Sequence, residues 1–205
     1  MKTIRTLILS LTLSLTLTLP AYAQLTIADL TTQLSQPQEL RAHFSQERTL
    51  TGFSRSLKAQ GTLLVSRDHG ILWRQSTPFA QDVVIDERGI LVGNATGLKT
   101  MSKADNPQLQ AFAQMLQALF AGDLSALEQF FTLELKGEPD KWQLTLTPTQ
   151  EPINLIFSAI ELEGAQYVNH VTLKDRAGDS TKIQFTEHQT KPSALTSDEE
   201  QLFAH

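Results

Sequence analysis

Cysteine is absent from the 205 residues of the chain. The protein therefore has no disulfide bonds, and it offers no thiolate ligands for a structural zinc site. It is also not itself a bacterial lipoprotein, because such a protein carries its lipid on a cysteine at the cleavage site. Burial of apolar side chains must supply the stability of the fold.

An excess of positive charge is missing as well. The chain has 17 basic and 22 acidic residues, which gives a net charge of −5, and it contains no basic run. This balance argues against nucleic acid as a partner and against electrostatic docking on anionic lipid. We therefore expect any contact with lipid to be hydrophobic.

Residues 1–23 have the features of a bacterial secretory signal peptide. Lys2 and Arg5 form a basic start, residues 7–19 alternate Leu with Ser and Thr, and "AYA" ends the segment at Ala23. The apolar part is short and rich in hydroxyl groups for a membrane span, although an uncleaved anchor is the alternative. We expect cleavage after Ala23, export to the periplasm, and one domain over residues 24–205.

The rest of the chain is dominated by alternating apolar and polar residues, which is typical of strands with one buried face. Thr26 is a candidate N-cap for a helix over 27–35, and Ser197 with Glu200 has capping-box spacing for a last helical turn. These patterns predict an α+β fold, mainly β, with a large curled antiparallel sheet whose concave apolar face is covered by helices. Strands are expected near residues 40–50, 57–66, 70–75, 81–86, 90–94, 98–101, 131–137, 142–148, 154–163, 167–175 and 181–188, and inserted helices near 106–122 and 124–130.

Motifs for catalysis and for metal binding are lacking. The five histidines form no metal-binding pair, and the sequence has neither a G-x-S-x-G elbow nor a glycine-rich phosphate loop. His43 and His170 are expected on solvated faces of strands. We expect no catalytic residue, no metal and no cofactor, although a triad assembled from distant residues leaves no motif. An esterase acting on acyl groups is the enzymatic alternative.

A curled sheet roofed by an amphipathic helix can enclose an apolar cavity. Each buried CH₂ group contributes about 0.8 kcal/mol, so one long acyl chain could contribute on the order of 10 kcal/mol before ordering costs. The same apolar stripes can equally form a filled core.

The stretch from residue 40 to residue 92 carries a family resemblance. Its residues, in order, are F-x-Q, then G-x-L, a basic residue before a loop, a tryptophan, a proline and an aspartate. They resemble the LolA-type outer-membrane lipoprotein carriers in order and spacing, and the similarity extends over most of the mature chain. The matching positions are Phe44, Gln46, Gly61, Leu63, Arg67, Trp73, Pro78 and Asp86.

This resemblance implies an unclosed β-barrel with a helical lid over a hydrophobic cavity. It also implies a periplasmic shuttle that takes acylated lipoproteins from an inner-membrane transporter to an outer-membrane acceptor. We expect a monomer with a lipoprotein or another lipid as cargo. A module of the same fold that senses lipid or lipoprotein without delivering it is the alternative.

Arg67 matches an arginine that holds the lid closed in this family. The resemblance implies that its guanidinium donates to carbonyl groups at the end of a lid helix, whereas a surface arginine of a hairpin is the alternative. Asp68 follows where the family usually has proline, and it could pair with Arg67 and weaken the latch. The candidate cavity residues, each of which could also be plain core, are Phe44, Leu63, Val65, Trp73, Phe112, Met115, Leu116 and Phe120.

Overall fold

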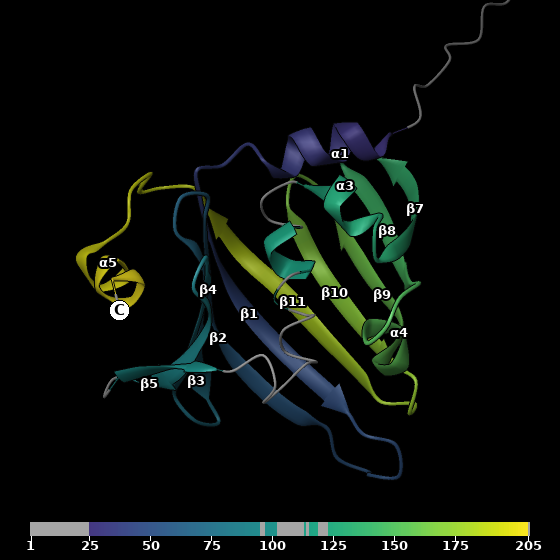
Figure 1. Cartoon of the computed structure of the whole chain (residues 1–205), viewed down its shortest axis with the longest axis horizontal. Helices are drawn as coiled ribbons and strands as arrows, with labels where there is room; N and C mark the ends of the chain where they lie inside the picture. The colour runs from purple at the N-terminus through teal and green to yellow at the C-terminus, as the bar shows by residue number, and fades with distance from the viewer. Residues whose placement is uncertain (1–24, 95–96, 102–112, 114, 119–122, 205) are drawn as a thin grey trace, which may run out of the picture.

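The computed structural model describes residues 25–94, 97–101, 113, 115–118 and 123–204, and its main feature is one curled antiparallel sheet (Figure 1). In the described residues the sheet has 11 strands in the order β6-β5-β4-β3-β2-β1-β11-β10-β9-β8-β7. The strands at its two ends, β6 and β7, do not pair with each other, so the barrel stays open. The predicted curled sheet is therefore confirmed. The strands are β1 (Glu39–Thr49), β2 (Leu57–Ser66), β3 (Gly70–Thr77), β4 (Gln81–Asp86), β5 (Gly89–Asn94), β6 (Gly97–Met101), β7 (Phe131–Glu138), β8 (Lys141–Pro148), β9 (Phe157–Gly164), β10 (Val168–Asp175) and β11 (Ser180–Gln189).

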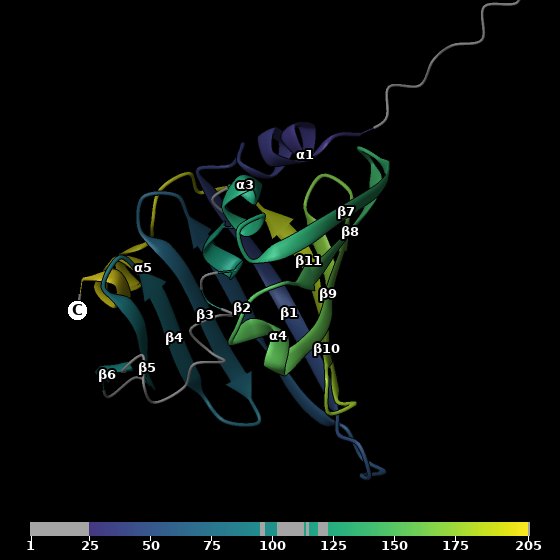
Figure 2. The same cartoon turned by 45° about the vertical axis from the view of Figure 1, so that its right-hand side comes forward.

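Short helices lie at one end of the sheet, on its concave side and outside it. Figure 2 shows α1 across one end, α3 and α4 on the concave side, and α5 on the outer side. The helix that was predicted over 106–122 falls mostly outside the described residues, but residues 115–118 are helical. The described helices are α1 (Ile27–Leu34), α3 (Leu124–Leu127), α4 (Ile153–Ile156) and α5 (Ser197–Phe203).

The predicted cap of α1 is confirmed. The backbone N–H of Asp29 donates to the Thr26 hydroxyl at 3.2 Å, and the Asp29 carboxylate accepts from the Thr26 N–H at 3.0 Å. Leu30 and Leu34 of this helix are buried. The polar cap therefore fixes where α1 begins, and the two leucines attach its inner side to the core.

Antiparallel pairing places the turns on two opposite rims. The β2–β3 turn (67–69) and the β9–β10 turn (165–167) lie beside α1, on what we call the α1 rim. The β1–β2 hairpin (50–56), the β3–β4 turn (78–80), the β10–β11 turn (176–179) and α4 lie at the other end, the distal rim (Figures 1 and 2).

The main hydrophobic core lies on the concave side. It combines inward side chains of the strands with buried residues of α1, of the helical residues 115–118 and of α3. Leu144 and Leu162 of the sheet and Leu124 of α3 have no exposed surface. The helices therefore bury the apolar side chains that alternation places on this face.

A second hydrophobic cluster lies on the convex side of β2–β5. Leu64, Leu72, Val84 and Leu91 are buried there beneath Phe203 of α5. The expectation that each strand has one wet face is therefore wrong for these four strands. Around these four residues the strands are buried on both faces, because the C-terminal helix covers the outer one there.

Two local predictions also need correction. The N-cap of α5 is Thr196, with Glu199 completing the capping box, and not Ser197 with Glu200. The strand predicted over 154–163 instead starts with the short helix α4, and β9 begins only at Phe157. In both cases an element of the predicted type is present, but it begins at a different residue from the one predicted.

Candidate functional site

The buried side chains of the concave face are almost all apolar in its described part. Four polar residues of the described chain are buried, namely Glu39, Ser66, Asp82 and Thr181. By strand register only Thr181 of these four shares a face with the inward side chains. The described interior therefore contains no buried charged side chain, which suits an apolar ligand and would disfavour a charged one.

The candidate cavity residues that the structure describes lie together in the concave core. Phe44, Leu63, Val65, Met115 and Leu116 are buried in one cluster, and the half-buried Trp73 packs against it. The remaining two candidates, Phe112 and Phe120, lie outside the described residues. The prediction thus named side chains that share one space, and their contact with a ligand stays a prediction.

Aromatic rings line the middle of this face. The ring centroids of Phe44 and Trp73 are 3.9 Å apart, and the rings are tilted by 31°. Trp73 meets Phe185 edge-on at 6.2 Å. Since Trp73 keeps part of its surface exposed, its indole is the ring of this trio that a ligand could contact without first displacing the core.

Polar contacts fasten α1 to the rim of the sheet. The Gln33 side-chain amide donates to the Ala165 carbonyl, which also accepts from the Trp142 indole N–H at 2.6 Å. The other contact comes from Arg67 of the β2–β3 turn, whose guanidinium donates to the carbonyl of Ser35, the C-cap of α1. Arg67 therefore satisfies a carbonyl that the end of the helix leaves without an intrahelical donor.

Asp68 interacts with the chain that follows α1. Its carboxylate accepts from the Gln38 side-chain amide at 2.7 Å, and the backbone N–H of Arg67 donates to the Gln38 carbonyl at 3.1 Å. Among the ion pairs of the described residues there is none between Arg67 and Asp68. The aspartate thus adds a second attachment for the helix end and leaves the arginine free to donate to Ser35.

A hollow of about 170 Å³ lies directly below these contacts. Arg67 and Asp68 line it together with the inward side chains Val65 and Ile71 and with Gln117 of the helical segment. The Gln117 amide donates to the Asp86 carbonyl at 3.5 Å. The space beside Arg67 therefore reaches the apolar side of the sheet at the α1 rim.

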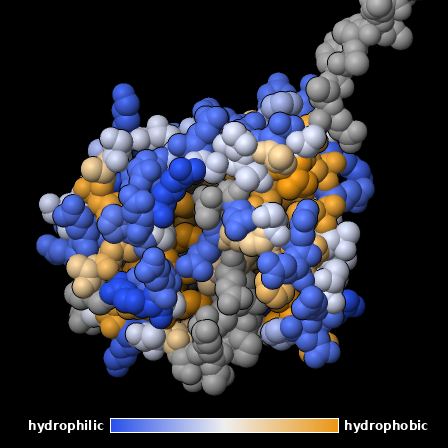
Figure 3. Space-filling view, turned by 45° about the horizontal axis from the view of Figure 1, so that its top comes forward, coloured by the Kyte–Doolittle hydropathy of each residue, from blue (hydrophilic) through white to orange (hydrophobic). Residues whose placement is uncertain are grey.

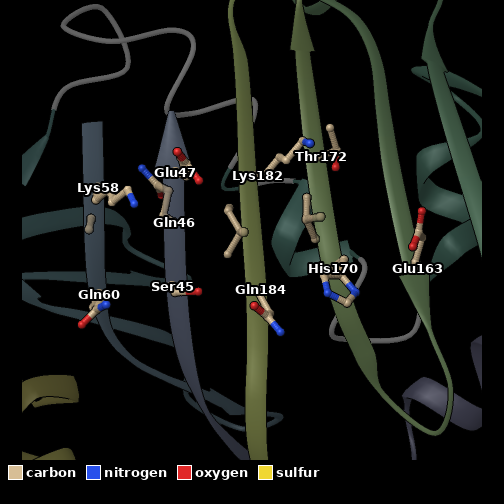
Figure 4. A pocket seen from close by; sticks show the side chains of 13 residues that line it. Ser45, Gln46, Glu47, Lys58, Gln60, Glu163, His170, Thr172, Lys182 and Gln184 are labelled. Carbon is tan, nitrogen blue, oxygen red and sulfur yellow. The ribbon is translucent and has the colours of Figure 1, made fainter. Parts of the chain in front are cut away.

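A larger hollow of about 540 Å³ lies on the convex face and has a different character (Figure 4). Polar side chains of β2, β1, β11 and β10 line it. Glu47 of β1 lies opposite Lys58 of β2 and Lys182 of β11 in the strand register. Ser45, Gln184 and His170 continue the next row. Polar and charged side chains dominate this surface, so it is not the predicted acyl-chain site.

The face of the molecule that Figure 3 shows carries both polar and apolar side chains. In Figure 3 the hydrophilic side chains cover much of the periphery, while apolar side chains gather toward the middle of the molecule and along one side. His43 and His170 are exposed on the outer face, as was predicted. Within the described ranges no cluster of three or more His, Asp or Glu could hold a metal ion.

An arginine that sequence reasoning missed holds the C-terminal segment against the sheet. Arg41 of β1 donates to both carboxylate oxygens of Glu199, at 2.9 and 2.7 Å, and to the carbonyls of Pro192 and Ala194 at 2.8 and 3.1 Å. The two side chains are only 16% and 14% exposed. Burial acts to raise the pKa of Glu199, but Arg41 and the Thr196 N–H outweigh it and hold the pKa below its ordinary value.

Glu39 is a second buried acid next to this clamp. One carboxylate oxygen accepts from the Ser66 hydroxyl at 3.0 Å, and the other has no hydrogen-bond partner. Burial raises the pKa of Glu39, and the hydrogen bond from Ser66 and the charge of Arg41 only partly oppose this shift. Its alternation with Leu40 was visible in the sequence, but its burial was not.

Comparison with known proteins gives this arrangement a context. Residues 35–199 match the family described as "Outer membrane lipoprotein carrier protein LolA". An outer-membrane lipoprotein carrier protein of Pseudomonas putida (strain W619) is 29% identical over 189 residues, which cover 90% of this chain and 87% of the relative.

Solved structures show looser similarity. A LolA superfamily protein of Nitrosomonas europaea is 9% identical, with 84% of this chain and 94% of that chain covered and a TM-score of 0.49. A chain of the Pseudomonas aeruginosa MucA/MucB complex is 20% identical, with coverage of 86% and 60% and a TM-score of 0.49.

In the described part of the chain no helix is long and apolar enough to cross a membrane. The family match covers most of the chain, and it includes Arg67, the clamp at Arg41 and the concave strands. The chain belongs to the LolA family of outer-membrane lipoprotein carrier proteins.

Proposed function

We propose that the protein is a periplasmic, non-enzymatic carrier that binds the acyl chains of lipoproteins, or of another lipid, and shuttles them from the inner to the outer membrane. The observation that carries this proposal is the concave face, whose described buried side chains are uncharged and which helices cover. An acyl chain placed there would be shielded from water, and it would leave no buried charge unpaired. The homologous carrier of Pseudomonas putida supports lipoprotein as the cargo.

Binding can be tested with the Trp73 indole as reporter. Replacing the chain's other tryptophan by Trp142→Phe leaves Trp73, which lies at the partly exposed edge of the aromatic trio. Delipidated protein should bind a fluorescent fatty acid with one-to-one stoichiometry, and the Trp73 emission should change on binding. A folded protein without saturable binding would contradict an acyl-chain site, and mass spectrometry of co-purifying lipid would identify the cargo.

Shuttling requires delivery as well as binding. Protein loaded with a fluorescent lipopeptide should release it to acceptor membranes that contain an outer-membrane receptor, and it should reload from donor membranes with an energised transporter. A protein that binds the lipopeptide but releases none to such acceptors would instead be a sensor.

The latch at Arg67 belongs to the same proposal. Its donation to the Ser35 carbonyl must break if α1 moves away from the sheet, so Arg67→Leu should change the rate of lipid transfer while the domain stays folded. Arg67→Lys keeps the charge but not the planar guanidinium, so its transfer rate should lie between those of Arg67→Leu and wild type. Lys141→Leu, at an exposed basic residue at the start of β8, is the matched control. Equal transfer rates for all four proteins would make Arg67 an ordinary turn residue.

A further inference from the structure

Large apolar side chains that remain exposed are concentrated on the distal rim. Phe79 in the β3–β4 turn is 79% exposed and Phe53 in the β1–β2 hairpin is 70% exposed. The other exposed large apolar side chains of the described residues are Leu57 at the start of β2, Phe130 just before β7, and Leu155 in α4. Four of these five belong to the distal rim or adjoin it, whereas Phe130 follows α3, which contacts α1.

Hydrogen bonds connect the elements of this rim to one another. The N–H of Thr51 in the β1–β2 hairpin donates to the Asp179 carboxylate at 2.9 Å. In the same β10–β11 turn, the N–H of Arg176 donates to the Ile156 carbonyl of α4 at 2.8 Å. The hairpin, the turn and α4 are therefore one connected edge (Figures 1 and 2), and Phe53 and Leu155 are carried on it together.

The two rims have different surroundings. On the α1 rim the turns present polar groups that are occupied in holding α1, such as Arg67, Asp68 and the Ala165 carbonyl. On the distal rim the apolar tips have no such role in the fold. Single exposed apolar side chains are common in proteins, but four of the five in the described residues gather at one edge, which indicates a surface that meets an apolar phase.

The chemistry of the rim favours a lipid bilayer over a protein partner. The apolar tips stand on separate turns of the chain, whereas a protein interface needs a contiguous, closely packed centre. Arg55 and Lys58 flank Phe53 and Leu57, and long basic side chains next to apolar anchors suit the headgroup region. Arg48 on this rim is already paired with Asp175 and Asp179, and the chain carries a net charge of −5. Attraction to the lipid would therefore be hydrophobic.

We propose that the distal rim docks on the surface of a phospholipid bilayer by inserting Phe53 and Phe79, with Leu57 and Leu155 completing the contact. This docking goes beyond the carrier function and does not depend on it. Because insertion depends on apolar side chains, binding to uncharged lipid should persist when salt is raised.

The test is flotation of the mature chain with vesicles made only of zwitterionic phosphatidylethanolamine and phosphatidylcholine. Wild-type protein should float with the vesicles, and about 0.5 M salt should change the bound fraction less than twofold. Phe53→Glu with Phe79→Glu should lower the partition coefficient at least tenfold, since each exposed phenylalanine would contribute to insertion. Both side chains are exposed, so the melting temperature should stay unchanged.

The matched control places the same two charges beside the phenylalanines. Ser54→Glu with Ala80→Glu changes exposed neighbours in the same two turns and should float within about threefold of wild type. Failure of wild-type protein to float, or equal flotation of the Phe53→Glu/Phe79→Glu protein, would overturn the proposal. Loss of binding in high salt would show electrostatic docking instead, and it would overturn insertion. Fatty-acid probe binding by the doubly substituted protein separates this result from the carrier proposal, because the concave core is untouched.

Discussion

Replacing Arg41 by leucine should detach the C-terminal helix from the sheet without unfolding the domain. Arg41 makes four hydrogen bonds to residues 192–199, two of them to a carboxylate that is mostly removed from water. Leucine would leave Glu199 without its cation and would leave the carbonyls of Pro192 and Ala194 without donors. The remaining attachment would be Phe203 on the convex cluster and the Arg88 guanidinium, which donates to the Phe203 carbonyl at 2.8 Å.

The structure sets the size of the expected effect. Breaking a fully buried ion pair costs about 3–5 kcal/mol, whereas an exposed pair contributes about 0–1 kcal/mol. The side chains of Arg41 and Glu199 keep roughly one sixth of their surface exposed, so we expect a loss of about 2–3 kcal/mol. The Thr196 N–H still donates to Glu199 at 2.7 Å, which supports the lower half of that range. Because the helix is terminal, this loss should appear as local opening.

Hydrogen exchange can measure this opening directly. Amides of α5 should exchange about 30- to 150-fold faster in Arg41→Leu, while amides at the centre of β1 and β2 should keep their protection. Arg48→Leu is the matched control, because Arg48 lies on the same strand but is more exposed and pairs with the β10–β11 turn. Unchanged exchange of α5 in Arg41→Leu, or equal acceleration in Arg48→Leu, would refute the reasoning.

Three further changes test other parts of the structure. Glu39→Gln should raise the free energy of unfolding above pH 7, because burial raises the pKa of Glu39 and its ionised form costs stability as pH rises through that pKa. This gain should vanish below about pH 4, where the carboxyl group is protonated in both states. Urea unfolding across pH measures it, and a loss of stability above pH 7 would show that the ionised acid stabilises the fold. Leu144→Ala should cost about 2–5 kcal/mol in the same assay, since Leu144 is fully buried, and a loss below about 1 kcal/mol would indicate a loosely filled interior. Gly61→Ala should lower the free energy of unfolding by about 1–3 kcal/mol, because a Cβ there would lie 2.0 Å from the Arg74 carbonyl oxygen. Thermal unfolding measures this loss, and a variant as stable as wild type would contradict the close approach.

The sheet and the inward faces were predictable because they depend on local alternation. Leu40, Ala42 and Phe44 lie two residues apart, and a strand places such residues on one face whatever its partners are. The cap at Thr26 was predictable for the same reason, since its hydrogen bonds span only three residues.

The convex cluster was visible in the sequence, but the assumption that each strand has one solvent-exposed face hid it. Leu63–Leu64, Ile71–Leu72, Val83–Val84 and Ile90–Leu91 are apolar pairs at adjacent positions, so each strand presents an apolar side chain to both faces. Such continuous runs are typical of strands buried on both sides. The sequence therefore indicated that something covers the outer face, although not which segment.

The Arg41 clamp could not be predicted, because its partner Glu199 lies 158 positions away. The acceptor of Arg67 was expected only through the family resemblance, and its identity as the Ser35 carbonyl required the path of the chain between α1 and β1. Asp68 shows the same limit. Its pairing with Gln38 depends on how two turns meet, which neither composition nor spacing encodes.

The open seam between β6 and β7 has a consequence for how the interior can change size. In a closed barrel the number of strands and their stagger fix the diameter, and widening it requires breaking a ladder of main-chain hydrogen bonds. Here the sheet ends at β6 on one side and at β7 on the other, so its circumference is not fixed by pairing. The curvature can relax by small changes of twist shared among the ten paired ladders, all of which stay intact. An interior enclosed by such a sheet can widen for ligands of different width without breaking backbone hydrogen bonds, and only side-chain contacts change.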